Sequence, residues 1–198
     1  MNLFVQTWQW LTDPASWSCG TGILARLAEH VVITAGVVAV AAIIALPIGI
    51  LIGHTGRGQG LIAAIAGAGR AIPTLGLLTL LGLFFGIGLT APMLALVVLA
   101  IPPMLAGAYS GVANVDRGTV KAARGIGMSE TQIIRHVEVP LAAPVVLGGI
   151  RSATIQVIAT ATLAAYIADE GLGRFILSGL KTRAYEEMTG GALLVIVL

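Results

Sequence analysis

The sequence predicts an all-helical integral membrane protein. Hydrophobic residues make up 57% of the 198 residues, charged residues make up only 10%, and the mean hydropathy is +0.97, which is far from an ordinary soluble domain. The apolar residues form long runs of the length that a helix needs to cross the hydrocarbon layer of a bilayer, about 20 residues. The net charge of +2 is too small to indicate a nucleic-acid partner.

The N-terminal segment, residues 1–29, is predicted to lie at the extracytoplasmic membrane surface. It lacks the basic start and continuous apolar core of a cleavable signal peptide, so we expect it to be retained. Trp8, Trp10 and Trp17 are typical of a membrane interface, where an aromatic ring is half hydrated and half buried. A frayed tail is the alternative. Cys19 is the single cysteine, which indicates a structural thiol and no disulfide framework.

Residues 30–198 are predicted to form the transmembrane domain, with four clear spans. The spans cover about residues 30–52, a stretch within 61–89, about 91–113 and about 141–168. A fifth run begins near Gly190 and is too short to cross, so we expect either that the natural chain continues past Leu198 or that this helix is cut short. Three pairs of glycines at four-residue spacing allow helix backbones to approach closely: Gly49 and Gly53, Gly82 and Gly86, and Gly107 and Gly111.

Basic residues in short loops predict the orientation, because Lys and Arg are retained on the cytoplasmic side. The loop of residues 114–140 is therefore predicted to be cytoplasmic, and residues 169–187 to be outside with the N-terminus. The basic residues on the cytoplasmic side are Arg57, Arg117, Lys121, Arg124 and Arg135. Arg70 has two interpretations: a functional residue inside the second span if that span starts at Leu61, or an interfacial anchor if it starts near Ala71.

The cytoplasmic loop contains the polar stretch "VKAARGIGMSETQIIRHVEVP", which is predicted to begin with a short helix. Asn114 or Asp116 can cap its start. Gly125 or Gly127 can end it with a residue of positive φ. Small side chains at Ala122 and Ala123 would let the surface of another protein sit close to this helix, although a solvated loop is the simpler alternative.

A second short helix is predicted to follow. Ser129 and Gln132 fit a capping box, in which each side chain satisfies a free amide at the helix start. Ile133, Ile134 and Val137 give this helix an apolar stripe. Pro140 is predicted to close it and to open the next span. The two helices would form a rigid elbow on the cytoplasmic surface.

The spacing in this loop resembles the EAA loop of the permease subunits of ATP-binding-cassette importers. The matching residues are Ala122, Ala123, Gly127, Val137, Val139 and Pro140. In that family the loop holds the coupling helix, which docks into a groove of the ATPase subunit. Lys121 departs from the pattern, because the family usually has Glu there. The resemblance implies an ATPase-coupling set of Lys121, Ala122, Ala123, Arg124, Gly127, Arg135, Val137 and Pro140.

The resemblance extends to most of the chain. Stretches such as "IPTLGLLTLLGLFFGIG", "RGIGMS" and "GGIRSATIQVIATATLAAYIADEGLG" are similar to the osmoprotectant branch, which takes up glycine betaine, carnitine, choline or proline. The family implies a type I importer permease with a five-span core, its last span truncated here, in the bacterial plasma membrane. It also implies membrane lipid around the chain and three kinds of protein partner: two ATPase subunits, a second identical or different permease subunit, and an extracytoplasmic substrate-binding protein. A permease for an amino acid or an oxyanion is the alternative within this class.

The chain has no "GxxxxGK[ST]" phosphate loop, so we expect no bound cofactor on it and ATP with Mg²⁺ on the partner ATPases. No catalytic or metal site is predicted, because His30, His54 and His136 are scattered and each is interpreted as a loop or interface residue. An ion-coupled secondary transporter would show acidic residues within its spans. A channel or structural subunit would need no elbow. The expected mechanism is therefore alternating access driven by the ATPases.

Candidate residues for the translocation pathway come from polar side chains in apolar segments. They are Thr74, Ser152, Thr154, Gln156 and Thr160, with Thr162 nearby. Hydrogen bonds between helices are an equally good explanation for them. Aromatic residues make up only 5% of the chain, so no aromatic cage for a quaternary ammonium is evident. We therefore expect high-affinity recognition to belong to the binding protein.

Overall fold

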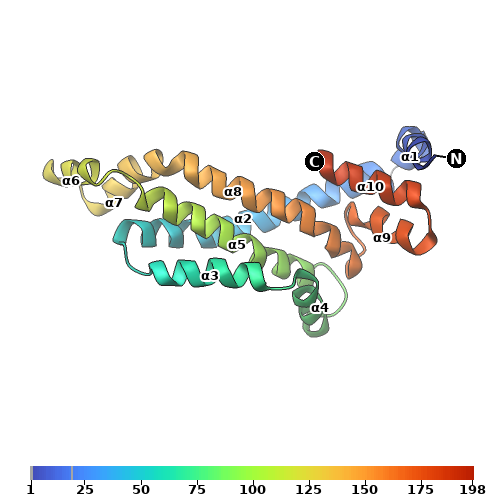
Figure 1. Cartoon of the computed structure of the whole chain (residues 1–198), viewed down its shortest axis with the longest axis horizontal. Coiled ribbons are helices and arrows are strands. Elements are labelled where there is room, and N and C mark those ends of the chain that lie inside the picture. The colour runs from blue at the N-terminus through green and yellow to red at the C-terminus, as the bar shows by residue number, and fades with distance from the viewer. Residues whose placement is uncertain (1, 19) are drawn as a thin grey trace. The chain divides into compact units, whose positions relative to one another are not determined.

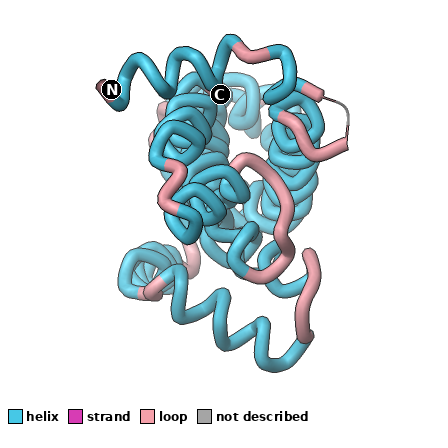
Figure 2. The backbone as a smooth tube through the Cα atoms, turned by 90° about the vertical axis from the view of Figure 1, so that its right-hand side faces the viewer, coloured by secondary structure: helices cyan, strands magenta, loops and turns pink. Residues whose placement is uncertain are grey.

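The computed structural model describes residues 2–18 and 20–198, apart from the side chain of Arg70. Helices and short loops account for these residues, and none of them lies in a strand (Figure 2). The predicted all-helical class is confirmed over this part of the chain. The interpretation of Cys19, and both interpretations of the Arg70 side chain, lie outside the described residues.

Three helices among the described residues are long and apolar enough to cross a membrane. They are α2 (Ile23–Thr55), α5 (Thr90–Ala113) and the helix Glu130–Tyr166, which contains α8 (Val139–Ala161). A fourth crossing exists if α3 (Gln59–Ala71) and α4 (Thr74–Phe85) count together as one broken span.

The second span predicted within residues 61–89 is thus interrupted and is not one continuous helix. The helix stops at Ala71, and Ile72 and Pro73 are extended, with ψ near 119° and 114°. Proline has no backbone N–H and disfavours the helical conformation in the residue before it, so the chain breaks here. Thr74 becomes the first residue of α4 rather than a residue at a kink.

The chain divides into two compact units. The first comprises Met1–Val37, Pro73–Leu96 and Gln156–Leu198, and the second comprises Val38–Ile72 and Val97–Ile155. The long helices α2, α5 and α8 each contribute residues to both units.

In the first unit, the N-terminal helix α1 (Leu3–Thr12) packs against α10 (Tyr185–Val197). The Trp10 ring lies on Gly190 of α10, where a Cβ atom would collide with it, and meets Phe175 of α9 (Gly173–Thr182) edge to face at 5.2 Å. The Trp17 indole N–H donates to the Leu11 carbonyl at 2.7 Å. Of the three tryptophans, only Trp8 is largely exposed, at 67%. Helix α1 is thus packed against α9 and α10 of its unit and is not a frayed tail.

In the second unit, glycines bring the long helices into close contact. A Cβ atom at Gly49 would lie 2.6 Å from that of Ala108, and one at Gly53 would lie 2.8 Å from that of Val112, which places α2 directly on α5. A Cβ atom at Gly107 would lie 2.7 Å from the Cα of Gly149 in α8. The close approach predicted from these glycine spacings is confirmed.

The remaining glycine pair behaves differently. In the first unit, a Cβ atom at Gly82 would lie 2.8 Å from Ile167. Gly86 has open space around it and ends α4 with φ +79°. Only Gly82 therefore serves helix packing, and Gly86 is a helix terminator.

Candidate functional site: the cytoplasmic coupling loop

The loop predicted to contact an ATPase begins with the short helix α6 (Arg117–Gly125). Asp116 caps it, accepting a hydrogen bond from the Thr119 amide at 2.7 Å and another from the Thr119 hydroxyl at 3.0 Å. These bonds hold the pKa of the Asp116 carboxyl below its usual value. Of the two predicted caps, Asp116 is therefore the one used. Gly127, with φ +88°, ends the helix as predicted, and the Met128 amide donates back to the Ala123 carbonyl.

The second short helix, α7 (Glu130–Ile133), starts with the predicted capping box. The Ser129 hydroxyl accepts from the Gln132 amide at 3.4 Å, and the Gln132 side chain accepts from the Ser129 amide at 2.8 Å. The sequence predicted that this helix ends at Pro140, but the helix continues past it. A π-helical turn, η2 (Ile134–Glu138), joins it to α8, so one helix runs from Glu130 into the membrane span.

The π-turn explains why Pro140 is tolerated. A proline inside a regular α-helix leaves one carbonyl without its amide partner. The wider turn uses bonds five residues apart, such as Val139 N–H to Ile134 O, immediately before the proline. The elbow consequently consists of one short helix, α6, and the N-terminal extension of α8 on which it packs (Figure 1).

An apolar cluster fixes the elbow to the ends of α5 and α8. Its buried members are Val112, Val115, Val120, Ala123, Ile133 and Ala142, with Ile50, Met128, Val137 and Val146 packed against them. Ala123 is only 6% exposed, so it belongs to this cluster and does not offer a surface to a partner. Ala123 lies on the inner face of α6 with Val120, and its part in ATPase coupling stays a prediction.

The outer face of the elbow carries most of the remaining predicted coupling residues. Exposed members are Lys121, Ala122, Arg124, Gly127, Arg135 and Pro140, while Val137 is half-buried. Ile126 joins them as an apolar side chain that is 81% exposed at the tip of the loop, next to Gly127. Ile126 was not among the predicted residues, although a single isoleucine between two glycines in a polar stretch could have marked it.

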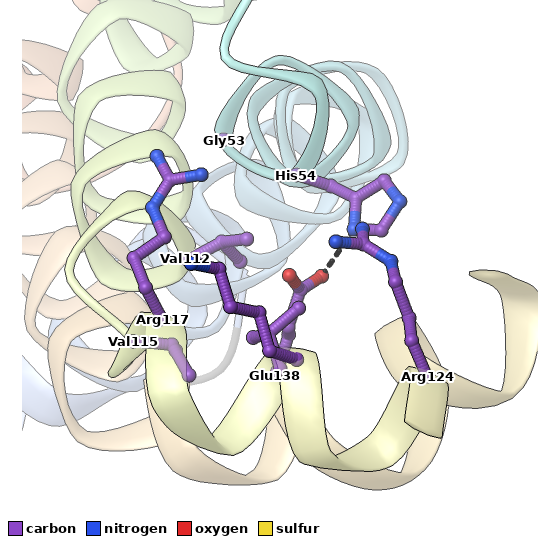
Figure 3. Close-up of a pocket in the computed structure, with 9 residues that line it drawn as sticks. Gly53, His54, Val112, Val115, Arg117, Arg124 and Glu138 are labelled. Atoms are coloured by element: carbon purple, nitrogen blue, oxygen red, sulfur yellow. Dashed lines mark hydrogen bonds and ion pairs between the residues drawn. The ribbon is translucent and has the colours of Figure 1, made fainter. Parts of the chain in front are cut away.

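A network of polar and charged side chains connects the elbow to the end of α2. Arg124 donates two hydrogen bonds to Glu130, at 2.8 and 2.9 Å, and these bonds hold the pKa of the Glu130 carboxyl below its ordinary value. The His54 ring lies between two carboxylates, with Nε2 3.1 Å from Glu130 and Nδ1 2.6 Å from Glu138. Figure 3 shows Arg124 reaching from α6 toward His54 and Glu138. These contacts join α2, α6 and the helix that begins at Glu130, all within the second unit.

His54 and Glu138 form the buried half of this network. Their side chains are only 8% and 5% exposed. They border a cavity of about 80 Å³ whose other polar lining includes Arg117, Lys121 and Arg124. From the sequence, His54 was interpreted as a loop or interface residue and Glu138 was given no role. The π-turn adds one residue to the helix and rotates Glu138 inward, and a simple helical periodicity does not reveal that rotation.

The histidines were all interpreted as loop or interface residues, and all three lie in helices. His30 is fully buried in α2, where Nε2 lies 3.0 Å from the Ile158 carbonyl of the same unit. His54 lies in the last turn of α2. His136 is exposed on the π-turn. Within residues 2–18 and 20–198, no group of His, Cys, Asp or Glu side chains is arranged to hold a metal ion.

The predicted pathway residues lie on α4 and α8. The Thr154 and Thr160 hydroxyls donate to carbonyls of their own helix, at 2.9 and 2.7 Å. Ser152 is exposed on α8, and Gln156 is half-buried. Thr74 is half-buried at the start of α4.

One charged residue of α8, Arg151, was not singled out from the sequence. Arg151 is exposed near the middle of α8, although the span was treated as apolar. The sequence showed it directly, because a single charge inside a predicted span is itself a signal.

Comparison with known proteins identifies the family. Residues 45–198 match the family described as "Binding-protein-dependent transport system inner membrane component". The chain belongs to this family. It is 34% identical to the choline transport system permease protein OpuBB of Bacillus subtilis over 90% of this chain and 82% of that protein. It is 32% identical to the carnitine transport permease protein OpuCB of Listeria monocytogenes over 100% of this chain and 81% of that protein.

The fold agrees with solved structures of importers. The chain superimposes on the inward-facing MetNI methionine ABC transporter with a TM-score of 0.76, covering 94% of this chain and 91% of that one at 20% identity. The predicted type I importer permease fold is thus confirmed. The protein is an inner-membrane, multi-pass permease component, and its family implies ATPase and substrate-binding partners.

Proposed function

We propose that this chain is the permease subunit of an ATP-driven importer for osmoprotectants, which lines the translocation pathway and receives the motion of the ATPases through α6. The observation that supports this role is the elbow itself: an exposed short helix on a buried apolar base, with the residue spacing of the EAA loop. Relatives named for choline and carnitine transport support the substrate class.

The assembly that follows contains two ATPase subunits, a second permease subunit and an extracytoplasmic binding protein. ATP and Mg²⁺ belong to the ATPases, and this chain performs no chemistry. Closure of the ATPases on ATP moves the two elbows together and opens the pathway outward, and hydrolysis resets it. Because α7 continues into α8, a displacement of the elbow is carried directly into a membrane span.

The elbow has two exposed features suited to docking. Ala122 is small, which lets a partner surface approach the α6 backbone, and Ile126 is an apolar side chain that gains by leaving water. Lys121 beside them carries the charge opposite to the usual Glu, so the partner surface is expected to present an acidic group there. Arg124 is already engaged with Glu130 and serves mainly to hold the elbow.

Transport by the reconstituted complex tests the function. Proteoliposomes containing this chain, its ATPase and its binding protein are expected to accumulate radiolabelled glycine betaine, carnitine, choline or proline only with ATP. Accumulation without ATP, or of none of these solutes, would contradict the proposal. An amino-acid or oxyanion importer would instead accumulate methionine or sulfate in the same assay.

Two substitutions test the docking surface. Ile126→Asp and Ala122→Trp are expected to leave membrane insertion intact and to abolish co-purification of the ATPase. Thr182→Asp, an exposed position on α9, is the matched control. Normal ATPase binding by both elbow variants would exclude this face as the docking site.

A further inference from the structure

Arg151 lies where a membrane helix rarely carries a charge. Along α8 it is twelve residues after Val139 and ten before Ala161, or about 18 and 15 Å at 1.5 Å per residue. Its side chain ends in a guanidinium cation, which only donates hydrogen bonds. No salt bridge within the described part of the chain includes it. A charge this far from both helix ends cannot reach the headgroup region by extending its side chain alone.

The opposite face of α8 is the one that packs inside the chain. Ala142, Ala153 and Val157 on that face are at most 1% exposed, and Gly149 lies against Gly107 of α5. Arg151 is two residues from both Gly149 and Ala153, or about 200° around the helix at 100° per residue. It therefore points away from α5, on the open side of α8.

Ser152 accompanies Arg151 on this open side. Both side chains are exposed, and their neighbours Leu147 and Ile155 are 62% and 56% exposed. Gly148 lies one turn before Ser152 and adds no side chain. Two adjacent polar groups thus interrupt an otherwise apolar stripe. A guanidinium facing lipid tails is strongly unfavourable, so in the membrane this stretch of the stripe faces water or protein.

We propose that Arg151 and Ser152 form a weak binding point in the translocation pathway for the carboxylate of a zwitterionic solute. This inference rests on the proposed function. A guanidinium offers two parallel N–H donors that match a carboxylate, and the adjacent hydroxyl supplies a third donor. A fixed positive charge repels a cation that has no carboxylate. The permease therefore favours solutes such as glycine betaine and carnitine, and disfavours choline.

Direct binding to the permease–ATPase complex, without the binding protein, tests this point. Saturation-transfer NMR detects weak binding through the methyl protons that glycine betaine and choline share. The wild-type complex is expected to transfer saturation to glycine betaine and much less to choline. Arg151→Gln is expected to weaken glycine betaine binding about tenfold or more. Arg151→Lys keeps the charge and loses the paired donors. Its affinity for glycine betaine is expected to lie between those of the wild type and Arg151→Gln.

The control is Arg57→Gln, which removes an exposed loop arginine and is expected to change nothing. Equal glycine betaine signals in wild type and Arg151→Gln would overturn the inference, as would equal binding of choline and glycine betaine by the wild type. Loss of the assembled complex in Arg151→Gln would instead identify Arg151 as a partner for an acidic residue of the second permease, which also overturns it. ATP-driven uptake by the wild type reports on the proposed function independently.

Discussion

Removing one member of the buried His54–Glu138 pair should destabilise the second unit. The two side chains are 8% and 5% exposed, and their nearest atoms are 2.6 Å apart. Truncating His54 leaves Glu138 buried without its counterpart, which costs about 3–5 kcal/mol. Truncating Glu138 leaves His54 with its second contact, to Glu130, and is expected to cost less. For a chain of this size each kcal/mol lowers the melting temperature by about 2–4 °C. We therefore expect His54→Ala to lower the melting temperature by roughly 6–20 °C and Glu138→Ala to lower it by less.

The measurement is thermal unfolding of the detergent-solubilised protein, followed by tryptophan fluorescence, for both single variants and the double variant. The double variant removes both buried polar groups at once. Its loss of stability is therefore expected to be smaller than the sum of the single losses, because each single loss contains the cost of an unpaired partner. His136→Ala, which truncates an exposed histidine of the same π-turn, is the control and is expected to change the melting temperature little.

Two results would refute the reasoning. Additive losses in the double variant would show that the two side chains do not interact. A loss in His136→Ala as large as that in His54→Ala would show that the effect comes from disturbing the turn and not from the buried pair.

Three further predictions follow from the packing and capping of the same unit. Gly149→Leu places side-chain atoms where a Cβ alone would lie 2.9 Å from the Gly107 Cα, so we expect aggregation on size-exclusion chromatography, and a monodisperse variant would contradict the close approach. Ala123→Leu is expected to lower stability by about 1–3 kcal/mol through overpacking, whereas Ala122→Leu unfolds like wild type; equal unfolding curves would contradict the inward position of Ala123. The pKa of Asp116 is lowered on folding, so its cap is complete above the ordinary carboxyl pKa and is lost as the pH falls through the folded value. Hydrogen exchange at Thr119, corrected for intrinsic rates, should therefore accelerate in acid, and no pH dependence should remain in Asp116→Asn.

Much of the fold follows from local patterns in the sequence. The long apolar runs predicted α2, α5 and α8, because length and hydropathy alone decide which helices can cross a bilayer. The capping box at Ser129 and the positive φ at Gly127 depend on a few neighbouring residues, so the sequence predicts them well. The glycine spacings predicted close helix contacts but could not name the partners.

The missed features depend on longer-range geometry. The side on which Ala123 lies depends on how α6 packs against Ile133, and the sequence does not specify that contact. The pairing of His54 with Glu138 joins residues 84 positions apart. The π-turn has no clear sequence signature apart from the proline that follows it, and without it Glu138 would not be placed on the buried face.

Because one uninterrupted helix runs from Glu130 into α8, the number of residues in the motif determines how α6 is rotated relative to the membrane span. Each residue inserted or deleted between Ile133 and Val137 would turn the preceding part of the chain by about 100° relative to the membrane span. Ile133 would then leave its apolar contacts, and Glu130 would swing away from both Arg124 and His54. The nine residues between Gly127 and Val137 thus fix the rotational position of α6 about the axis of α8. They thereby fix the direction in which a partner bound to α6 would move α8.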